Sequence, residues 1–410
     1  MPLPNLPVNR HYYKSWCLIR LGKTAEAQIA IATAEKEPAD YCFPNALEAI
    51  EALQCVVDFA GKAPKALYYL GNLWYDKRRY PTAIAAWERS SREDETFPTV
   101  WRNLSLAYFN KMNRPDEAVA LLEKAFRLDH TDARVLMELD QLYKRLNRPH
   151  IERLCFLEQH IDIVMTRDDL YLEYVTLLNQ TGQYREAIRR IDQRKFHPWE
   201  GGEGKVPAQY QLARLELAKE LINRKKYDDA LALIDECYIY PTHLGEGKLP
   251  GAQENDFNYY KAYILQQQGR PEEAHSLFVK ACSGNSQPAA AMYYNDQKPD
   301  KIFYQGLAYR KLGEEENARS RFNQLITYGE EHLFDRFKMD YFAVSLPDLL
   351  IWEDDMDKKN RIHCNYLMAL GHLGLGNRTK AEHFFDIAAS MDNNHQGVQI
   401  HRKLMNTILS

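Results

Sequence analysis

The chain lacks any long apolar stretch, since no segment approaches the roughly 18 consecutive apolar residues that span a bilayer. It also lacks a basic tail or a block of Lys and Arg, because 53 basic and 57 acidic residues give a formal net charge of -4. Nucleic acid is therefore a poor fit as a partner. Met1-Pro2-Leu3-Pro4 is not a basic region followed by an apolar run, so we expect no signal peptide, no membrane contact and a cytoplasmic location.

Paired cysteines are also missing. The seven cysteines lie singly at positions 17, 42, 55, 155, 237, 282 and 364, and no two have the spacing of a CxxC motif. This scatter argues against a disulfide framework and against a zinc site. We expect buried free thiols, and we expect neither a metal nor a cofactor.

What the chain does contain is an internal repeat. A helical pattern of the order large, Leu, small, aromatic returns after 34 residues: Leu67, Leu70, Gly71 and Trp74 are followed by Trp101, Leu104, Ser105 and Tyr108. The tripeptide Asn113-Arg114-Pro115 returns as Asn147-Arg148-Pro149, again after 34 residues. Later copies keep the same order around Gly306 and Ala369. A period of 34 residues is that of the tetratricopeptide repeat, a pair of antiparallel helices.

The repeat predicts an all-α fold. We expect about eight or nine helical hairpins, stacked as a right-handed superhelix (an α-solenoid) with a concave groove. Glycines should follow the first helix of several hairpins, because glycine tolerates the left-handed conformation that ends a helix; these are Gly22, Gly182, Gly269, Gly313 and Gly376. Acidic pairs after these turns, such as Glu272-Glu273, suit helix N-termini.

Two successive repeats carry an insertion. Residues 202–207 read Gly-Glu-Gly-Lys-Val-Pro and residues 245–250 read Gly-Glu-Gly-Lys-Leu-Pro, at an offset of 43. A phosphate-binding loop would need Ser or Thr after the lysine, which neither copy has. One interpretation is structural, with Glu and Lys pairing across neighbouring loops. The other is a binding surface made of Trp199, Glu203, Lys205, Glu246 and Lys248.

These loops suggest a division of the chain into three parts along one continuous solenoid. Residues 1–195 form the N-terminal hairpins, residues 196–256 the two hairpins with duplicated loops, and residues 257–410 the C-terminal hairpins. Two more stretches leave the repeat pattern. The first, 285–301, contains Tyr294 and Asn295, which suit sugar or peptide recognition or else simply fill a packed loop. The second, 331–362, contains a charge run that we expect to cap a helix.

Certain segments resemble a narrower family. They are residues 196–205, 251–255, 341–348 and 360–364, and they include Asn255. They resemble the C-terminal tetratricopeptide half of large bacterial proteins in which a mutarotase-like β-sandwich domain of unknown function comes first. The resemblance implies a loose link to carbohydrate metabolism and supplies no catalytic residue. Since this chain has no β-rich segment, we expect a fragment or a stand-alone relative of that longer architecture.

Three functions follow as hypotheses. A non-catalytic scaffold would bind a protein or peptide through the loops, or in its groove through residues such as Tyr68, Asn72, Tyr75, Arg102 and Phe109. Tyr68 and Arg102 depart from the pattern of the chaperone-tail clamp. Alternatively, the chain is the accessory half of a carbohydrate-active protein and contacts its β-sandwich domain or that domain's sugar ligand. A free-standing enzyme is disfavoured, because His363 and Cys364 are adjacent and point to different sides of a helix. The ends of the solenoid could also self-associate.

Overall fold

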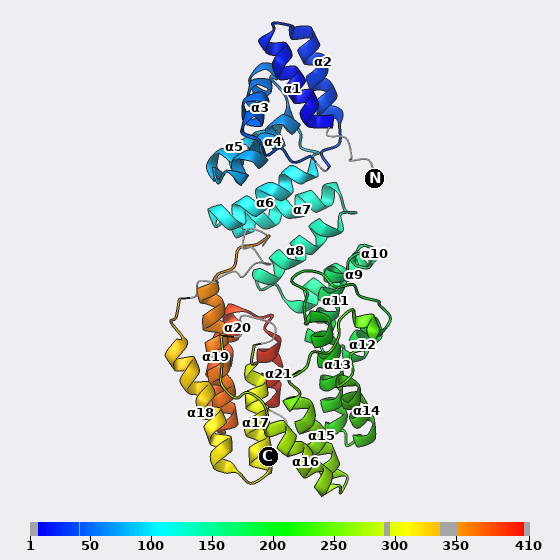
Figure 1. Cartoon of the computed structure of the whole chain (residues 1–410), viewed down its shortest axis with the longest axis vertical. Helices are drawn as coiled ribbons and strands as arrows, with labels where there is room; N and C mark the ends of the chain where they lie inside the picture. Colours follow the sequence, from blue (N-terminus) through cyan, green and yellow to red (C-terminus); the bar gives the residue numbers. More distant parts are fainter. Residues whose placement is uncertain (1–6, 41, 291–295, 337–350, 406–410) are drawn as a thin grey trace. The chain divides into compact units, whose positions relative to one another are not determined.

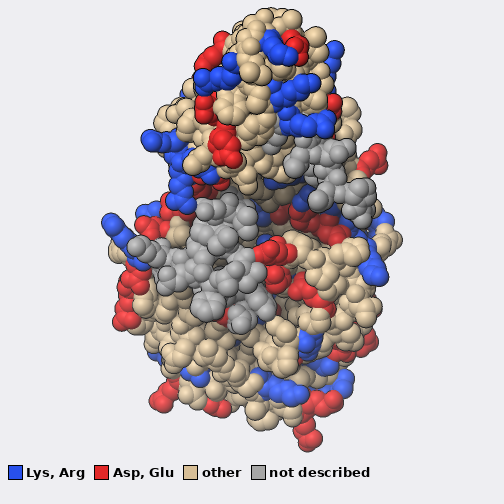
Figure 2. All heavy atoms as spheres, turned by 45° about the horizontal axis from the view of Figure 1, so that its top comes forward, with Lys and Arg blue, Asp and Glu red and all other residues tan. Residues whose placement is uncertain are grey.

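The computed structural model describes residues 7–40, 42–290, 296–336 and 351–405, and these residues form helices and no strand. They divide into two compact units: unit 1 contains residues 1–142 with 351–353, and unit 2 contains residues 143–350 with 354–410. None of the helices in the described part of the chain is long and apolar enough to cross a membrane. On the face shown in Figure 2, basic and acidic side chains both occur and neither covers it continuously.

Unit 1 is built from the first eight helices, of which the eighth runs past its boundary (Figure 1). They are α1 (Pro7–Arg20), α2 (Thr24–Lys36), α3 (Leu47–Ala60), α4 (Pro64–Asp76), α5 (Tyr80–Glu93), α6 (Pro98–Met112), α7 (Pro115–Leu128) and α8 (Ala133–Arg145). Consecutive helices pack as hairpins, notably α1 with α2, α4 with α5, and α6 with α7.

Unit 2 continues the same arrangement in its own helices. They are α9 (His150–Gln159), α10 (Ile161–Val164), α11 (Asp168–Gln180), α12 (Tyr184–Asp192), α13 (Lys205–Asn223), α14 (Tyr227–Cys237), the 3-10 turn η1 (Thr242–Leu244), α15 (Asn255–Gln267), α16 (Pro271–Cys282), α17 (Pro299–Lys311), α18 (Glu315–His332), α19 (Met356–Gly374), α20 (Arg378–Met391) and α21 (Gln396–Leu404). The hairpins include α13 with α14, α15 with α16, α17 with α18, and α19 with α20. The fold is therefore the predicted all-α tetratricopeptide solenoid, whereas the three-part division at residues 195 and 256 stays a prediction.

Small residues stand where the two helices of a hairpin approach most closely. A Cβ atom on Gly71 would lie 2.4 Å from the ring of Trp87, and one on Gly306 would lie 2.4 Å from the ring of Phe322. The aromatic ring of the second helix thus fills the space that the glycine leaves in the first. This contact occurs in both units and explains why the small and aromatic positions recur together in the sequence.

The helix ends follow the predicted chemistry. All five predicted glycines have positive φ angles, from 71° at Gly22 to 81° at Gly313. In the two Asn-Arg-Pro copies the same position is taken by Asn113 and Asn147, with φ angles of 52° and 56°, because asparagine tolerates this region better than most residues. Glu272 and Glu273 lie in the first turn of α16, as expected. The charge run also caps a helix, since Asp355 accepts a hydrogen bond from the backbone of Lys358 at 2.8 Å.

The expectation of buried thiols is correct for four of the seven cysteines, Cys42, Cys237, Cys282 and Cys364. Cys55 is half-buried, and the expectation is wrong for Cys17 and Cys155, which are exposed. The helices that carry these two residues, α1 and α9, each leave one face to solvent, and a lone cysteine is compatible with either face. Burial raises the pKa of Cys282 and that of Cys364 to about 12, so both stay protonated at neutral pH.

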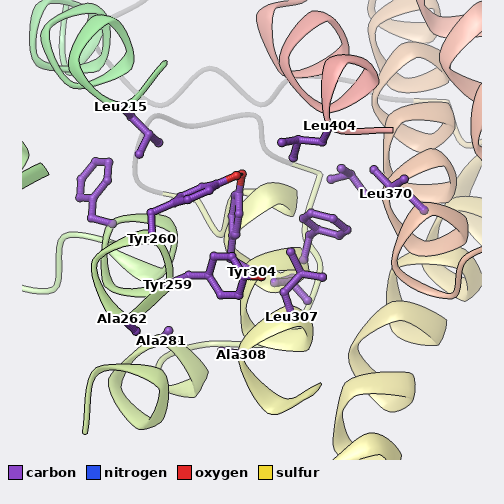
Figure 3. Close-up of a cluster of buried hydrophobic side chains, with 14 of the residues drawn as sticks. Leu215, Tyr259, Tyr260, Ala262, Ala281, Tyr304, Leu307, Ala308, Leu370 and Leu404 are labelled. Atoms are coloured by element: carbon purple, nitrogen blue, oxygen red, sulfur yellow. The ribbon is translucent and has the colours of Figure 1, made fainter. Parts of the chain in front are cut away.

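The core of unit 2 includes its last helix, α21. In Figure 3, Tyr260 of α15 and Tyr304 of α17 point toward each other, and their hydroxyl oxygens lie 3.3 Å apart. Leu404 of α21 and Leu370 of α19 belong to the same buried cluster. His401 of α21 is 3% exposed, and its Nδ1 lies 3.1 Å from the hydroxyl of Tyr366. The C-terminal helix is therefore an internal part of unit 2.

Candidate functional site

The predicted groove residues of unit 1 hold helices together. Tyr68 is buried, and its ring lies 4.9 Å from that of Phe97 in an edge-to-face arrangement. The side-chain oxygen of Asn72 accepts hydrogen bonds from Nε1 of Trp87 at 3.1 Å and from Nδ2 of Asn103 at 3.0 Å. Asn72 thus connects α4 with both α5 and α6, and its hydrogen-bonding capacity is largely used within the protein.

Arg102 makes a forked ion pair with Glu138 of α8, with two N–O distances of 2.6 Å. The Glu138 side chain is wholly buried, and Arg134 reaches the same carboxylate at 2.9 Å. Burial lowers the pKa of Arg102, but the hydrogen bonds and charge of Glu138 outweigh burial and raise it. A two-point pair of this kind sets the spacing of α6 and α8.

Next to this pair, residues 351–353 lie against α6 and α8. Asn110 binds the backbone of this segment at two points: its Nδ2 donates to the carbonyl oxygen of Ile351 at 2.8 Å, and its Oδ1 accepts from the N–H of Glu353 at 3.0 Å. An amide side chain carries an NH2 donor group and a carbonyl acceptor, which match the C=O of one residue and the N–H of the residue two positions later. This recognition uses only main-chain groups of the segment and is independent of its side chains.

Trp352 is the side chain that this contact buries. It is 1% exposed, and its ring lies 5.1 Å from that of Phe109 with an interplanar angle of 76°. Its Nε1 donates to the carbonyl oxygen of Glu138 at 3.2 Å. The indole therefore combines an edge-to-face aromatic contact with a satisfied polar atom, which is the usual requirement for a buried tryptophan.

Glu353 adds a charge contact at the end of the segment. Its carboxylate pairs with Lys111 of α6, whose ammonium also lies 4.5 Å from the centre of the Tyr80 ring. Burial lowers the pKa of Lys111, but Glu353 outweighs burial and raises it. We call the surface formed by Phe109, Asn110, Lys111 and the Glu138 carbonyl the Asn110 face. The Asn110 face contacts two backbone groups, one aromatic ring and one acidic side chain of residues 351–353.

The sequence predicted that Phe109 lies in the groove, on the same helix as Arg102. It did not predict a role for Asn110, Lys111 or Trp352. A signal was present for the first two, since they directly follow Phe109. For Trp352 the only signal was an aromatic residue next to an acidic run in a segment outside the repeat pattern. Nothing local indicates that residues 351–353 contact α6, more than 200 positions earlier in the chain.

The paired loops contact each other in unit 2. The N–H of Phe196 donates to the carbonyl oxygen of His243 at 2.8 Å, and Oε2 of Glu246 accepts from the N–H of Gly204 at 2.7 Å. Nζ of Lys248 donates to the carbonyl oxygen of Tyr238 at 3.1 Å and pairs with Glu254. Glu246 therefore joins the two loops, as the structural interpretation expects, whereas Lys248 contacts residues on either side of its own loop.

A cavity of about 270 Å³ lies between the loops. Its lining includes Trp199, Glu203 and Glu246, and it does not include Lys205 or Lys248. Burial raises the pKa of Glu246, as does the nearby Glu203, while the hydrogen bond from Gly204 opposes them. Burial and the charge of Lys144 lower the pKa of Lys205. The binding role of these five residues stays a prediction, and the cavity brings only three of them together.

The remaining predicted residues divide as follows. Asn255 is buried, and its Nδ2 donates to the carbonyl oxygens of Ala281 and Ser283 at 2.9 and 2.8 Å, so it caps the end of α16. Tyr294 and Asn295 lie outside the described residues.

His363 and Cys364 contact different partners, the carbonyl oxygen of Ala289 and the side chain of Asn360. They form no dyad, and burial lowers the pKa of His363 to about 4.

Comparison with known proteins identifies tetratricopeptide repeats in two segments, residues 98–132 and residues 302–328. The first contains Phe109, Asn110 and Lys111, which are the part of the Asn110 face that α6 contributes. Among solved structures, the chain is similar to YrrB, described as a tetratricopeptide protein with an unusual peptide-binding site, at 15% identity over 46% of this chain and 91% of that one, with a TM-score of 0.35.

Two further structures show similar likenesses. A tetratricopeptide repeat protein from Parabacteroides merdae matches at 15% identity over 74% of this chain and 99% of that one, with a TM-score of 0.29. A chain of the Naa15/Naa10 structure bound to HypK-THB matches at 12% identity over 87% of this chain and 64% of that one, with a TM-score of 0.39. At such scores these likenesses add nothing to the fold described above.

Proposed function

We propose that this chain, which carries tetratricopeptide repeats, is a protein-interaction scaffold that binds an extended peptide segment of a partner on the Asn110 face. The observation that carries the proposal is the two-point contact of Asn110 with the backbone of Ile351 and Glu353. The repeat at residues 98–132, which contains Asn110, supports a role in protein binding.

The main-chain groups of the bound segment need hydrogen-bond partners. An extended peptide has an unpaired C=O and N–H at each residue, and removing them from water is costly unless each finds a partner. Asn110 supplies both partners to a bound segment whose central side chain is buried. The ion pair of Arg102 with Glu138 and the Asn72–Asn103 bond hold the neighbouring helices without help from the segment, so this face is formed in advance of binding, which lowers the entropic cost.

The test uses a variant with an open face, in which Ile351, Trp352 and Glu353 are replaced by Gly, Ser and Gly; we call it the open variant. Peptides selected on it from a random library should lose about ten-fold or more in affinity when Asn110→Ala is added, because two hydrogen bonds of about 1 kcal/mol each are removed. Asn317→Ala, at an exposed position of α18, is the matched control and should change nothing. If calorimetry finds no peptide whose affinity depends on Asn110, the proposal is wrong.

A second candidate is the accessory role in a carbohydrate-active protein, suggested by the resemblance of the loop segments. It is favoured by the cavity between the loops, where Trp199 lies with Glu203 and Glu246: a flat apolar ring beside carboxylates suits a sugar ring with its hydroxyl groups. Calorimetry with monosaccharides and uronic acids, on the wild-type chain and on Trp199→Ala, tests it. The double variant Lys205→Ala with Lys248→Ala tests instead whether a protein domain docks on the outer surface of the loops.

A further inference from the structure

We infer that residues 351–353 are an intramolecular occupant of the Asn110 face, and that this face also binds a partner's peptide in which tryptophan is followed by an acidic residue. This inference rests on the proposed function and specifies the peptide. It follows from the chemistry of the contact, in which each of three successive positions meets a different recognition element.

The first element is the backbone contact, which sets the register of the peptide. Asn110 joins the C=O of Ile351 to the N–H of Glu353, and the residue between them directs its side chain toward α6 and α8. That residue is Trp352, which is almost fully buried against Phe109. The bond from its Nε1 to the Glu138 carbonyl oxygen, at 3.2 Å, distinguishes tryptophan from phenylalanine, which has no donor.

The second element is the ion pair made by the residue after the tryptophan. Lys111 pairs with Glu353, and the carboxylate of Glu138 is already occupied by Arg102 and Arg134. The ammonium of Lys111 is therefore the charge available to a side chain at this position, and it favours Glu or Asp. The Glu353 side chain is still 53% exposed, so the charge contact contributes to selectivity more than to affinity.

The segment differs from the helices around it in how it is held. Residues 351–353 lie before the start of α19, and their polar contacts include Asn110, Lys111 and the Glu138 carbonyl. A free peptide with the same three groups can make the same contacts. It must, however, compete with an occupant on the same chain, whose effective concentration is on the order of millimolar for a tethered segment.

The experiment measures fluorescence anisotropy of a labelled peptide that copies residues 349–355, Leu-Leu-Ile-Trp-Glu-Asp-Asp. We expect the open variant to bind it at least ten-fold more tightly than the wild-type chain, because the competing segment is gone. Replacing the tryptophan of the peptide by alanine should weaken binding at least ten-fold. Replacing its first acidic residue by lysine should weaken binding several-fold, and Lys111→Glu in the open variant should restore it.

Circular dichroism first checks that the open variant is folded. If it is not, Glu353→Lys in the otherwise unchanged chain replaces it, since this side chain is half exposed and its reversal weakens the occupant without removing Trp352. Equal binding to wild-type and open chains would overturn the role of residues 351–353 as a competitor. Equal binding of the alanine peptide would overturn the tryptophan preference.

The outcomes also separate this inference from the proposed function. If library peptides bind the open variant in an Asn110-dependent way but show no preference for tryptophan, the scaffold function stands and the inference falls. If no peptide of any sequence binds with dependence on Asn110, both fall.

Discussion

In each unit a segment from late in the chain packs against helices of the repeats; we call it the occupant of that unit. The two occupants are held in different ways. In unit 1 the occupant is the segment 351–353, whose contacts include one asparagine, one buried ring and one exposed ion pair. In unit 2 it is the helix α21, together with the residues before it. Gln396 exchanges two hydrogen bonds with Gln209, at 2.8 and 3.0 Å, and Arg153 donates to Asn394 at 2.6 Å.

This difference indicates how readily a separate peptide could replace each occupant. Main-chain recognition of three residues can be reproduced by any suitable peptide. By contrast, α21 buries Val398, His401 and Leu404 among several helices, and its contacts depend on the whole set of side chains. We therefore expect α21 to be part of the folding core of unit 2, and segment 351–353 to be a ligand of unit 1.

The largest effect should come from removing α21. Deletion of residues 396–410 should abolish the cooperative unfolding transition of unit 2, because several buried side chains of about 1.5–3 kcal/mol each are lost. Hydrogen exchange followed by mass spectrometry should show lost protection in α17 and α19 and unchanged protection in α4 to α7. Arg402→Ala, on the exposed side of α21, serves as the control and should cost less than about 1 kcal/mol. Retained protection in α17 would show that α21 is as exchangeable as the segment in unit 1.

Arg153→Ala should have the next largest effect. The side chain of Arg153 is wholly buried and pairs with Glu173 at 2.7 Å. Although burial raises the pKa of Glu173, Lys144 and Arg153 lower it to about 2. Removing one partner of a buried pair costs about 3–5 kcal/mol, which urea unfolding of unit 2 would measure. A loss below about 1 kcal/mol would mean that Asn394 and the chain before α21 are not anchored through Arg153.

Acidification should change the stabilities of the two units differently. Burial lowers the pKa of His401 and that of His363 to about 4, against 6.5 for an exposed histidine; Asp300 opposes this effect at His401, and Lys219 adds to it. The unfolded state therefore binds more protons between about pH 6.5 and 4, and unit 2 should lose roughly 3 kcal/mol between pH 7 and pH 5. His401→Gln should remove about half of this dependence.

Unit 1 contains a buried carboxyl group whose contribution to stability changes with pH in the opposite direction. Burial raises the pKa of Glu35, so this carboxyl favours the folded state more as the pH falls. Urea titrations at pH 7 and pH 5, read by hydrogen exchange in each unit, should therefore show destabilisation in unit 2 and none from this source in unit 1. Equal losses in both units would contradict this assignment.

The smallest effect on stability should come from emptying the Asn110 face. The open variant loses the burial of Trp352, about 3 kcal/mol, and the three hydrogen bonds of the segment with Asn110 and the Glu138 carbonyl, but it also avoids ordering three residues at about 1–2 kcal/mol each. We expect a net loss of no more than about 2 kcal/mol in unit 1, with α4 to α8 still folded, measured by urea unfolding. A loss above about 4 kcal/mol would place Trp352 in the core of unit 1, as α21 is in that of unit 2.

Much of the fold could be predicted because it is encoded locally. Gly71 faces Trp87 16 positions later, and Gly22 ends α1 with a positive φ angle, so both features lie within one hairpin. The candidate site was predictable only in part. Arg102 and Phe109 mark one side of α6 through helical spacing, but the pairing of Arg102 with Glu138 joins residues of different hairpins, which helical spacing does not indicate.

By itself, then, the sequence determined the helices, their ends and the pairing of neighbours, since periodicity and backbone preference act over fewer than about 40 residues. Only the tertiary structure decided that Trp352 lies against Phe109 and that α21 belongs among α13, α17 and α19. The physical reason is that a three-residue segment and a nine-residue helix carry too little local signal to encode a position. Their places are selected by the complementarity of a surface that exists only after the repeats have stacked.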